Sequence, residues 1–589
     1  MNIERKVYLS ALILSLTACA VDHEVKVDQH TEKVPLGAPH TLITQEKQKV
    51  LLDEREAPVS ERFTYDQVSI KHAAIEPQKK VKQLANSSYE LASMPAKIAS
   101  NHIPYSDIPP QFYQDKDREQ YASLAQSAVK QVISEPVSTF SIDVDTGSYT
   151  NIRRMLNQGY LPPADAVRIE EMINYFGYAY ETPTDNVTPF SIQTELAMSP
   201  WSKDHALLRI GLKGYEPITD KRPASNLVFL LDVSGSMNAP DKLPLLKKSL
   251  LLLSKQLTSA DKVAIVVYAG ASGTVLEPTA GNQTLLIEQA LDKLSAGGST
   301  NGQAGIELAY QLAKQHYDSS GINRVILATD GDFNVGTSNV DSLKTLIEQK
   351  REEGISLTTL GFGTGNYNDE LMEQLADVGN GNYAYIDGLN EARKVLVEEL
   401  DSTLMTIAKD VKIQVEFNPE IVKEYRLLGY ENRSLAREDF NNDKVDAGEI
   451  GAGHTVTALY ELVLKGSEGQ RVDPLRYQNA SKSQSNASDY MTNELAFIKF
   501  RYKAVNTMKS KLISRPVFKS HQITDFDQAS EDFRFSATVA EFGEVLRQSK
   551  YVEGLDYKTM IEHALNAKGA DPFGYRSEFI QLLRLASNL

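Results

Sequence analysis

The stretch Leu227-Val228-Phe229-Leu230-Leu231-Asp232-Val233-Ser234-Gly235-Ser236 indicates the fold of the central part of this chain. Its first five residues form an apolar run without polar alternation, which is typical of a strand buried on both faces. One acidic and two hydroxyl residues follow directly, so they belong at the carboxyl end of that strand. Open α/β sheets bind their ligands at that end. The stretch therefore predicts a parallel sheet that carries a polar site at one edge.

Strand and helix patterns alternate from this stretch to about residue 402. Leucines at helical spacing run from Leu243 to Leu257, and a second apolar run covers 263–267. Further strands are expected at 324–329, 356–362 and 383–385. Each of these is followed by a helical period, and such alternation indicates a doubly wound, mostly parallel, Rossmann-like sheet.

The regions on either side of this α/β unit show strict alternation of apolar and polar residues. The alternating runs are 206–212 before it and 411–417, 456–464 and 496–502 after it. Such runs predict antiparallel strands with one solvated face. We expect strands from both sides to pair in one sheet or sandwich, with the α/β unit inserted between them, because neither half could bury a core alone.

A chain of 589 residues is too long for one hydrophobic core, so several domains are expected. We expect a signal peptide at 1–18, a polar, mostly disordered stalk at 19–136, an N-terminal module at 137–225, the α/β domain at 226–402, a β-rich domain at 403–515 and a helical C-terminal segment at 516–589. A helical C-terminus is predicted because Phe535, Val539, Phe542 and Leu546 recur at helical spacing. In the N-terminal module, helices are expected near 148–157 and 164–176.

The N-terminus contains the chain's single cysteine, Cys19. The apolar run Val7–Leu16 is too short to span a bilayer but fits the core of a secretory signal. Its ending, Leu16-Thr17-Ala18-Cys19, resembles the bacterial lipobox, which implies a cysteine that carries lipid, palmitate included. Ala20 is not the Asp that signals retention at the inner membrane. We therefore expect a lipoprotein of the outer membrane that faces the periplasm.

Two further polar residues complete a candidate metal site with Asp232, Ser234 and Ser236. Thr300 lies in a glycine-rich loop before a helix, and Asp330 follows the strand expected at 324–329. Both should reach the same sheet edge as the first three residues. Oxygen-only ligands suit a hard cation, so we expect Mg²⁺, with Ca²⁺ or Mn²⁺ as alternatives.

The Asp-x-Ser-x-Ser loop, the later Thr and the Asp after a central strand resemble the metal ion-dependent adhesion site (MIDAS) of von Willebrand factor type A (VWA) domains. The resemblance implies that all five residues hold one cation, and that a Glu or Asp of a protein partner completes its coordination. The flanking regions, with Ser141-Ile142-Asp143-Val144-Asp145-Thr146 and Asp571-Pro572-Phe573-Gly574-Tyr575-Arg576, resemble a family of bacterial secreted VWA proteins with a paired N-terminal module and C-terminal domain.

Acidic residues exceed basic ones, 78 against 62, which disfavours nucleic acid as a partner. We expect cation-dependent protein binding at a bacterial envelope, as an adhesion or scaffold protein that is not an enzyme. One alternative is an envelope aspartic peptidase that uses Asp145 of Asp145-Thr146-Gly147, although no second such string exists in the chain. Another is a scaffold whose cation is purely structural.

Overall fold

The computed structural model describes residues 119–184, 187–217, 222–331, 340–473, 493–505, 507–552 and 556–589. The chain divides into two compact units, 1–106 and 107–589, and every described residue belongs to the second. The expectations for the signal peptide, for Cys19 and for most of the polar stalk lie outside the described residues. Within the part described, no helix is both long and apolar enough to cross a membrane.

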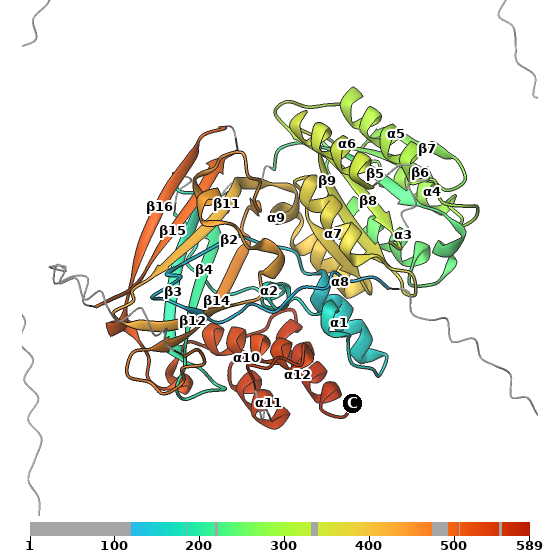
Figure 1. Cartoon of the computed structure of the whole chain (residues 1–589). Helices are drawn as coiled ribbons and strands as arrows, with labels where there is room; N and C mark the ends of the chain where they lie inside the picture. Colours follow the sequence, from blue (N-terminus) through green and yellow to red (C-terminus); the bar gives the residue numbers. More distant parts are fainter. Residues whose placement is uncertain are drawn as a thin grey trace, which may run out of the picture. The chain divides into compact units, whose positions relative to one another are not determined.

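The predicted α/β domain is built on one six-stranded sheet (Figure 1). Its strands, in spatial order, are β10 (Tyr383–Ile386), β9 (Ser356–Phe362), β8 (Ile322–Thr329), β5 (Ser225–Asp232), β6 (Lys262–Tyr268) and β7 (Ser272–Ala280). All neighbours are parallel except β6 and β7. Strand β5 lies inside the sheet and every one of its residues is buried, as its apolar run predicts.

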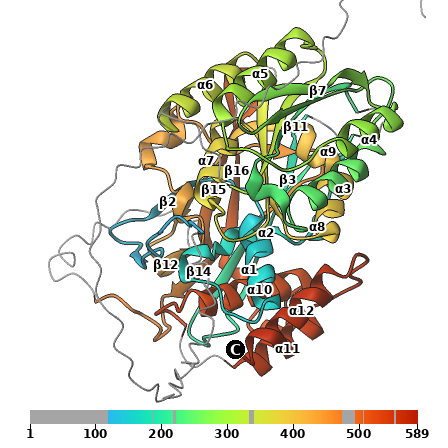
Figure 2. The same ribbon diagram turned by 90° about the vertical axis from the view of Figure 1, so that its right-hand side faces the viewer.

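Helices cover both faces of this sheet (Figures 1 and 2). One face packs against α3 (Leu243–Ser254), α4 (Thr284–Asp292), α8 (Leu389–Arg393), the π-helical turn Lys394–Glu398 and α9 (Leu400–Leu404). The other face packs against α5 (Gly302–Gln315), α6 (Val340–Glu352) and α7 (Asp369–Val378). Two apolar cores, one on each face, therefore hold the strand ends at fixed positions, and the polar site is built on those ends.

A β-sandwich accompanies the α/β domain, and both flanks contribute to it. One sheet has the order β1 (Lys130–Gln131), β12 (Val422–Leu428), β14 (Thr455–Leu464), β4 (Ala206–Gly214) and β3 (Phe190–Met198). The other has β13 (Ile450–Gly451), β11 (Thr406–Phe417), β15 (Glu494–Ala504) and β16 (Ser510–Phe518), with β2 (Val137–Ser141) also paired to β11.

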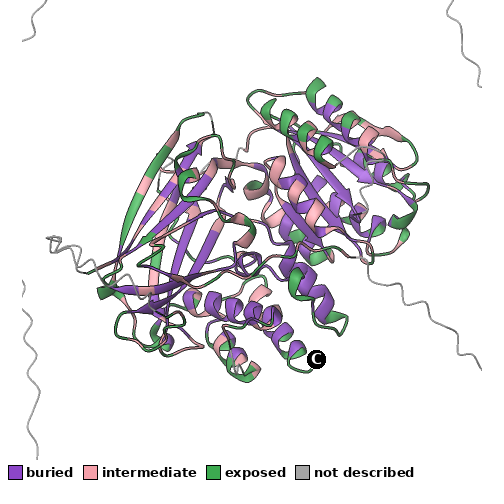
Figure 3. Ribbon diagram, in the orientation of Figure 1, coloured by how far each residue is buried: buried purple, intermediate pink, exposed green. Residues whose placement is uncertain are grey.

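The two flanks share one core, so the prediction of an inserted α/β domain is confirmed. Strand β4, before the insertion, pairs with β14 after it, and Leu208 lies opposite Tyr460. Strand β2 pairs with β11, where Phe140 lies opposite Ile413. The inward residues of both sheets form a single apolar cluster. In Figure 3 this interior is buried, whereas the edge strand β16 is largely exposed.

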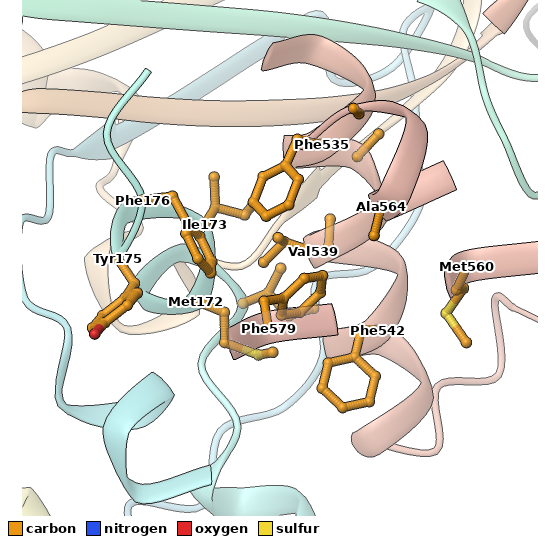
Figure 4. Packing of buried hydrophobic residues seen from close by; sticks show 14 of the residues in the cluster. Met172, Ile173, Tyr175, Phe176, Phe535, Val539, Phe542, Met560, Ala564 and Phe579 are labelled. Carbon is orange, nitrogen blue, oxygen red and sulfur yellow. The ribbon is translucent and has the colours of Figure 1, made fainter. Parts of the chain in front are cut away.

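A helical layer covers the outer face of the sheet that contains β4. It consists of α1 (Gly147–Asn157), α2 (Ile169–Asn174), α10 (Glu531–Leu546), α11 (Tyr557–Asn566) and α12 (Tyr575–Ala586). Alternation along β4 explains the packing, because Leu207 faces these helices and Leu208 faces the sandwich core. Phe535, Val539, Phe542 and Phe579 pack around Phe176 and Met172 of the N-terminal module (Figure 4).

Four details differ from the sequence-based expectations. Strands β4 and β14, expected to have one solvated face, are buried on both faces because the helical layer covers the outer one. Residues 119–136, expected at the end of a disordered stalk, pack on the folded part and include β1, whose Lys130 pairs with Tyr425. The helix expected over 164–176 is two shorter pieces, the 3₁₀ turn Ala164–Ala166 and α2, separated by extended backbone at Val167 and Arg168. The edge strand β7 was not predicted, because its residues are only partly buried and do not alternate.

Candidate metal site at the sheet edge

Asp232 is the last residue of β5, and its carboxylate is completely buried. One carboxylate oxygen accepts the backbone N–H of Ser234 at 2.8 Å. The other accepts the hydroxyls of Tyr268 at 3.1 Å and Thr329 at 2.9 Å. These two donors come from the ends of the neighbouring strands β6 and β8. Asp232 is therefore fixed in place by three strands, with its charge at the sheet edge.

The loop after Asp232 presents two hydroxyls side by side. The Oγ atoms of Ser234 and Ser236 are 2.9 Å apart. Ser234 is buried. Ser236 is exposed and is the second residue of the short 3₁₀ turn Gly235–Asn238. The two oxygens can thus act together on one ligand, one from inside the site and one from its rim.

Backbone hydrogen bonds hold the loop that contains Thr300 against this turn. The Gly297 N–H donates to the carbonyl of Val233 at 2.8 Å, and the Gly235 N–H donates to the carbonyl of Gly298 at 3.1 Å. Gly298 has a φ of +86°, a backbone conformation that favours glycine. Thr300, two residues further on, is half-buried directly before α5. The two loops predicted to form one site are therefore neighbours.

Asp330 follows β8, the strand next to β5, and is buried. Its position is one residue beyond Thr329, which already contacts Asp232. Burial is the largest effect that raises the pKa of Asp232, and the negative charge of Asp330 adds to it, against the hydrogen bonds from Ser234 and Thr329. Asp330 therefore follows the residue that already donates to Asp232, at the same sheet edge.

The donor set fits a hard divalent cation. Two buried carboxylates supply charge, and Ser234, Ser236 and Thr300 supply neutral oxygens, the ligand types that Mg²⁺, Ca²⁺ and Mn²⁺ prefer. A cation there would offset the repulsion between Asp232 and Asp330. These five residues would hold it and leave its remaining positions for solvent or a partner group.

Sequence reasoning missed three residues that shape this site. Tyr268 and Thr329 hold Asp232, and the ammonium of Lys242 lies 2.9 Å from Oδ2 of Asp330. The two hydroxyl residues could have been found, because Thr329 ends the strand predicted at 324–329 and Tyr268 directly follows the one predicted at 263–267. Lys242 gave no such signal, because a lysine at the start of a helix usually faces solvent.

Asp145, the residue behind the peptidase alternative, is held in a structural network. Its carboxylate accepts the backbone N–H of Tyr383 at 2.8 Å and contacts Arg433 at 3.3 Å. Burial raises the pKa of Asp145, and Asp143 and Asp377 raise it further. The cavity beside it measures about 40 Å³, which is room for water and far too small for a peptide.

A second group of buried carboxylates lies apart from the sheet edge. Oxygens of Asp143, Glu171 and Glu373 are all within 4.8 Å of one another. Two arginines pair with them: Arg433 contacts Asp143 at 3.1 Å and Glu373 at 3.1 Å, and Arg168 contacts Glu171. This group therefore has its own counter-charges and joins the α/β domain to the flanking module.

Comparison with known proteins agrees with this architecture. A family model described as von Willebrand factor type A domain matches 226–398, one described as von Willebrand factor matches 115–209, and one described as "Uncharacterized protein YfbK, C-terminal" matches 402–589. The fold and these matches define the chain as a VWA-domain protein.

Individual relatives extend the comparison over most of the chain. The protein YfbK of Escherichia coli (strain K12) is 47% identical over 475 residues, which cover 80% of this chain and 81% of that protein. This chain belongs to the YfbK family. Inter-alpha-trypsin inhibitor heavy chain H3 of Mesocricetus auratus is 22% identical over 351 residues, or 53% of this chain and 39% of that one. A solved von Willebrand factor type A structure from Catenulispora acidiphila aligns over 69% of this chain and 92% of its own, at 14% identity and a TM-score of 0.37.

Proposed function

We propose that this chain binds an acidic protein partner in a divalent-cation-dependent manner at the bacterial envelope, without catalysis. The observation that carries the proposal is the convergence of Asp232, Asp330 and the Ser234–Ser236 hydroxyl pair at one sheet edge. In this proposal those residues and Thr300 hold one Mg²⁺, or Ca²⁺ or Mn²⁺ in its place. When bound, the cation supplies a positive charge that an acidic side chain of a partner can reach.

The exposure of the site favours partner binding over a purely structural cation. The two carboxylates are buried, but Gly235, Ser236, Gly297 and Ser299 at the rim are exposed. A structural cation is normally enclosed by protein ligands, whereas this edge opens to solvent on one side. A Glu or Asp of the partner could approach there. Cation and partner would then strengthen each other's binding by the same factor, typically about 5- to 150-fold.

We also propose that the protein is anchored by lipid on Cys19 at the outer membrane and faces the periplasm. The lipobox-like sequence and Ala20 after it support this. An anchored adhesion or scaffold protein would act on other envelope proteins. Its excess of acidic residues makes nucleic acid an unfavourable partner.

The experiment that tests this function is cross-linking in cells, followed by capture in Mg²⁺ or in chelator. The variant is Ser234→Ala with Ser236→Ala, because Asp232 also holds Tyr268 and Thr329 and its loss would disturb the strands. A matched control is Ser259→Ala with Ser319→Ala, two exposed serines in the loops that precede β6 and β8, at the opposite ends of these strands from the site. We expect partners that are captured by wild type and control in Mg²⁺ and lost in the variant and in chelator. Partners captured equally in chelator would contradict the proposal.

A further inference from the structure

Lys242 places a fixed positive charge inside the candidate metal site. It is the residue before α3, and its side chain is 8% exposed. Its ammonium is 2.9 Å from Oδ2 of Asp330 and 3.4 Å from Oδ1 of Asn366. A buried ion pair of this kind is strongly held, because loss of either partner would leave an uncompensated buried charge.

The surrounding backbone is shaped to accept this lysine. Gly363, just after β9, has a φ of +74°, and a Cβ at that position would lie 2.3 Å from Cγ of Lys242. The lysine stem therefore passes directly over a residue that must lack a side chain. Backbone hydrogen bonds fix the other end, since Lys242 donates to the carbonyl of Ala239 and accepts from Leu246. The ammonium cannot easily swing away from Asp330.

The charge of the ligand set follows from this contact. Asp232 and Asp330 contribute two negative charges and Lys242 one positive charge. With a divalent cation the site carries a net charge of +1, and one carboxylate from a partner would bring it to zero. Without Lys242 the site with its cation would already be neutral, and an added carboxylate would make it negative.

We infer that Lys242 sets the site to hold its cation weakly alone and firmly only together with an anionic group. Lys242 is thus a positioning residue that acts through Asp330, and this inference rests on the proposed function. Two measurable effects of opposite sign follow from this role. Removal of the lysine charge should tighten the binding of the metal alone and weaken the help that a carboxylate gives. A lysine that only stabilises the fold would not produce that pair of changes.

The test measures Mg²⁺ binding to the purified full chain by titration calorimetry, in sodium chloride and again with sodium acetate as the carboxylate probe. For Lys242→Met we expect Mg²⁺ affinity in chloride to rise about tenfold or more, because a like charge has left the site. The gain in affinity that wild type shows in acetate should shrink in this variant. Lys242→Arg keeps the charge and should stay close to wild type. Lys248→Met, an exposed lysine on the same helix, is the matched control and should change neither value.

The outcomes separate this inference from the proposed function. If wild type binds Mg²⁺ and Lys242→Met binds it equally or more weakly, the inference is overturned and the proposed function stands. If neither wild type nor any variant binds Mg²⁺, the proposed function fails, and the inference fails with it. Should Lys242→Met not fold, Lys242→Gln, which can still donate a hydrogen bond to Asp330 without a charge, is held to the same expectations.

Discussion

The guanidinium of Arg168, at the start of α2, donates to the carboxylate of Asp369 in α7 at 2.6 Å. Both side chains are at most 2% exposed. Arg168 belongs to the N-terminal flank and Asp369 to the VWA domain, so one buried ion pair joins parts that are 201 residues apart. The same guanidinium also contacts Glu171 of its own helix, and its pair with Asp369 lies beside the tyrosine hydroxyl of Tyr383. A buried ion pair thus joins the VWA domain to the N-terminal flank, in addition to the covalent chain.

Arg168→Met should therefore destabilise the protein strongly. It would leave the carboxylates of Asp369 and Glu171 buried without the positive charge of Arg168. Such a loss typically lowers the free energy of unfolding by roughly 3–5 kcal/mol. Thermal and urea unfolding of the full chain measure this loss. Arg393→Ala is the control, because its pair with Glu398 is more than half exposed on the arginine side and should cost less than about 1 kcal/mol. Equal stability of Arg168→Met and wild type would contradict the role given to this pair.

Glu541 of α10 should make stability depend on pH. Burial raises its pKa to about 8, and one of its carboxylate oxygens has no hydrogen-bond partner among the described residues. The folded state therefore binds this proton more tightly than the unfolded state. The protonated Glu541 side chain therefore contributes to the free energy of unfolding. This contribution is fully present below about pH 4.5 and is lost as the pH rises towards 8, by up to roughly 1.4 kcal/mol per pH unit.

Glu541→Gln should remove that dependence. We expect its melting temperature to match wild type near pH 5 and to exceed it increasingly up to pH 8.5. Scanning calorimetry across this range measures the difference. Glu562→Gln, an exposed residue of the neighbouring helix α11, should follow wild type at every pH. A constant difference between Glu541→Gln and wild type would show that Glu541 does not titrate in this way.

Asp145→Asn tests the peptidase alternative. The carboxylate of Asp145 accepts the Tyr383 N–H and contacts Arg433, so the change should cost about 1–3 kcal/mol of stability. Cation-dependent capture of partners should be unchanged. Incubation of wild type and variant with envelope proteins provides the readout, and a pepstatin-sensitive cleavage that disappears in the variant would refute the structural role.

Cys19→Ser tests the anchor. Without its sulfur the chain cannot take lipid, so we expect it to leave the membrane fraction or to keep its signal. Fractionation and mass spectrometry of the N-terminus report both effects. Ser10→Ala, within the apolar run of the signal, should still be lipidated. Normal processing and outer-membrane fractionation of Cys19→Ser would rule out the lipoprotein assignment.

The sequence was sufficient for the elements whose pattern reflects burial. The apolar run of β5 and the alternation along β4 and β11 follow from which faces are covered, so these strands and the inserted domain could be predicted. Strand β7 could not, because an edge strand with half-buried residues needs no alternation. The extended backbone at Arg168 was missed because its reason is the distant Asp369, which local spacing does not reveal.

The residues of the candidate site likewise include some that the sequence predicts and one that it does not. Asp232, Ser234 and Ser236 are close in sequence and follow one strand, and Asp330 follows the strand beside it, so the topology of a parallel sheet predicts their meeting. Lys242 reaches Asp330 across 88 positions, from a helix start that a sequence pattern would place in solvent. The Lys242 side chain passes over Gly363, where no side chain blocks it. Such a contact depends on the folded backbone, so the sequence pattern does not reveal it.

Titration calorimetry of the full chain with Mg²⁺, after treatment with chelator, measures whether Asp232, Ser234, Ser236, Thr300 and Asp330 hold a cation. We expect wild type and the control Ser259→Ala with Ser319→Ala to bind one cation. Ser234→Ala with Ser236→Ala should lose much of this affinity, with a fold that is intact by circular dichroism. Absence of Mg²⁺, Mn²⁺ and Ca²⁺ binding in wild type, or equal affinity in the hydroxyl variant, would contradict the proposed cation site.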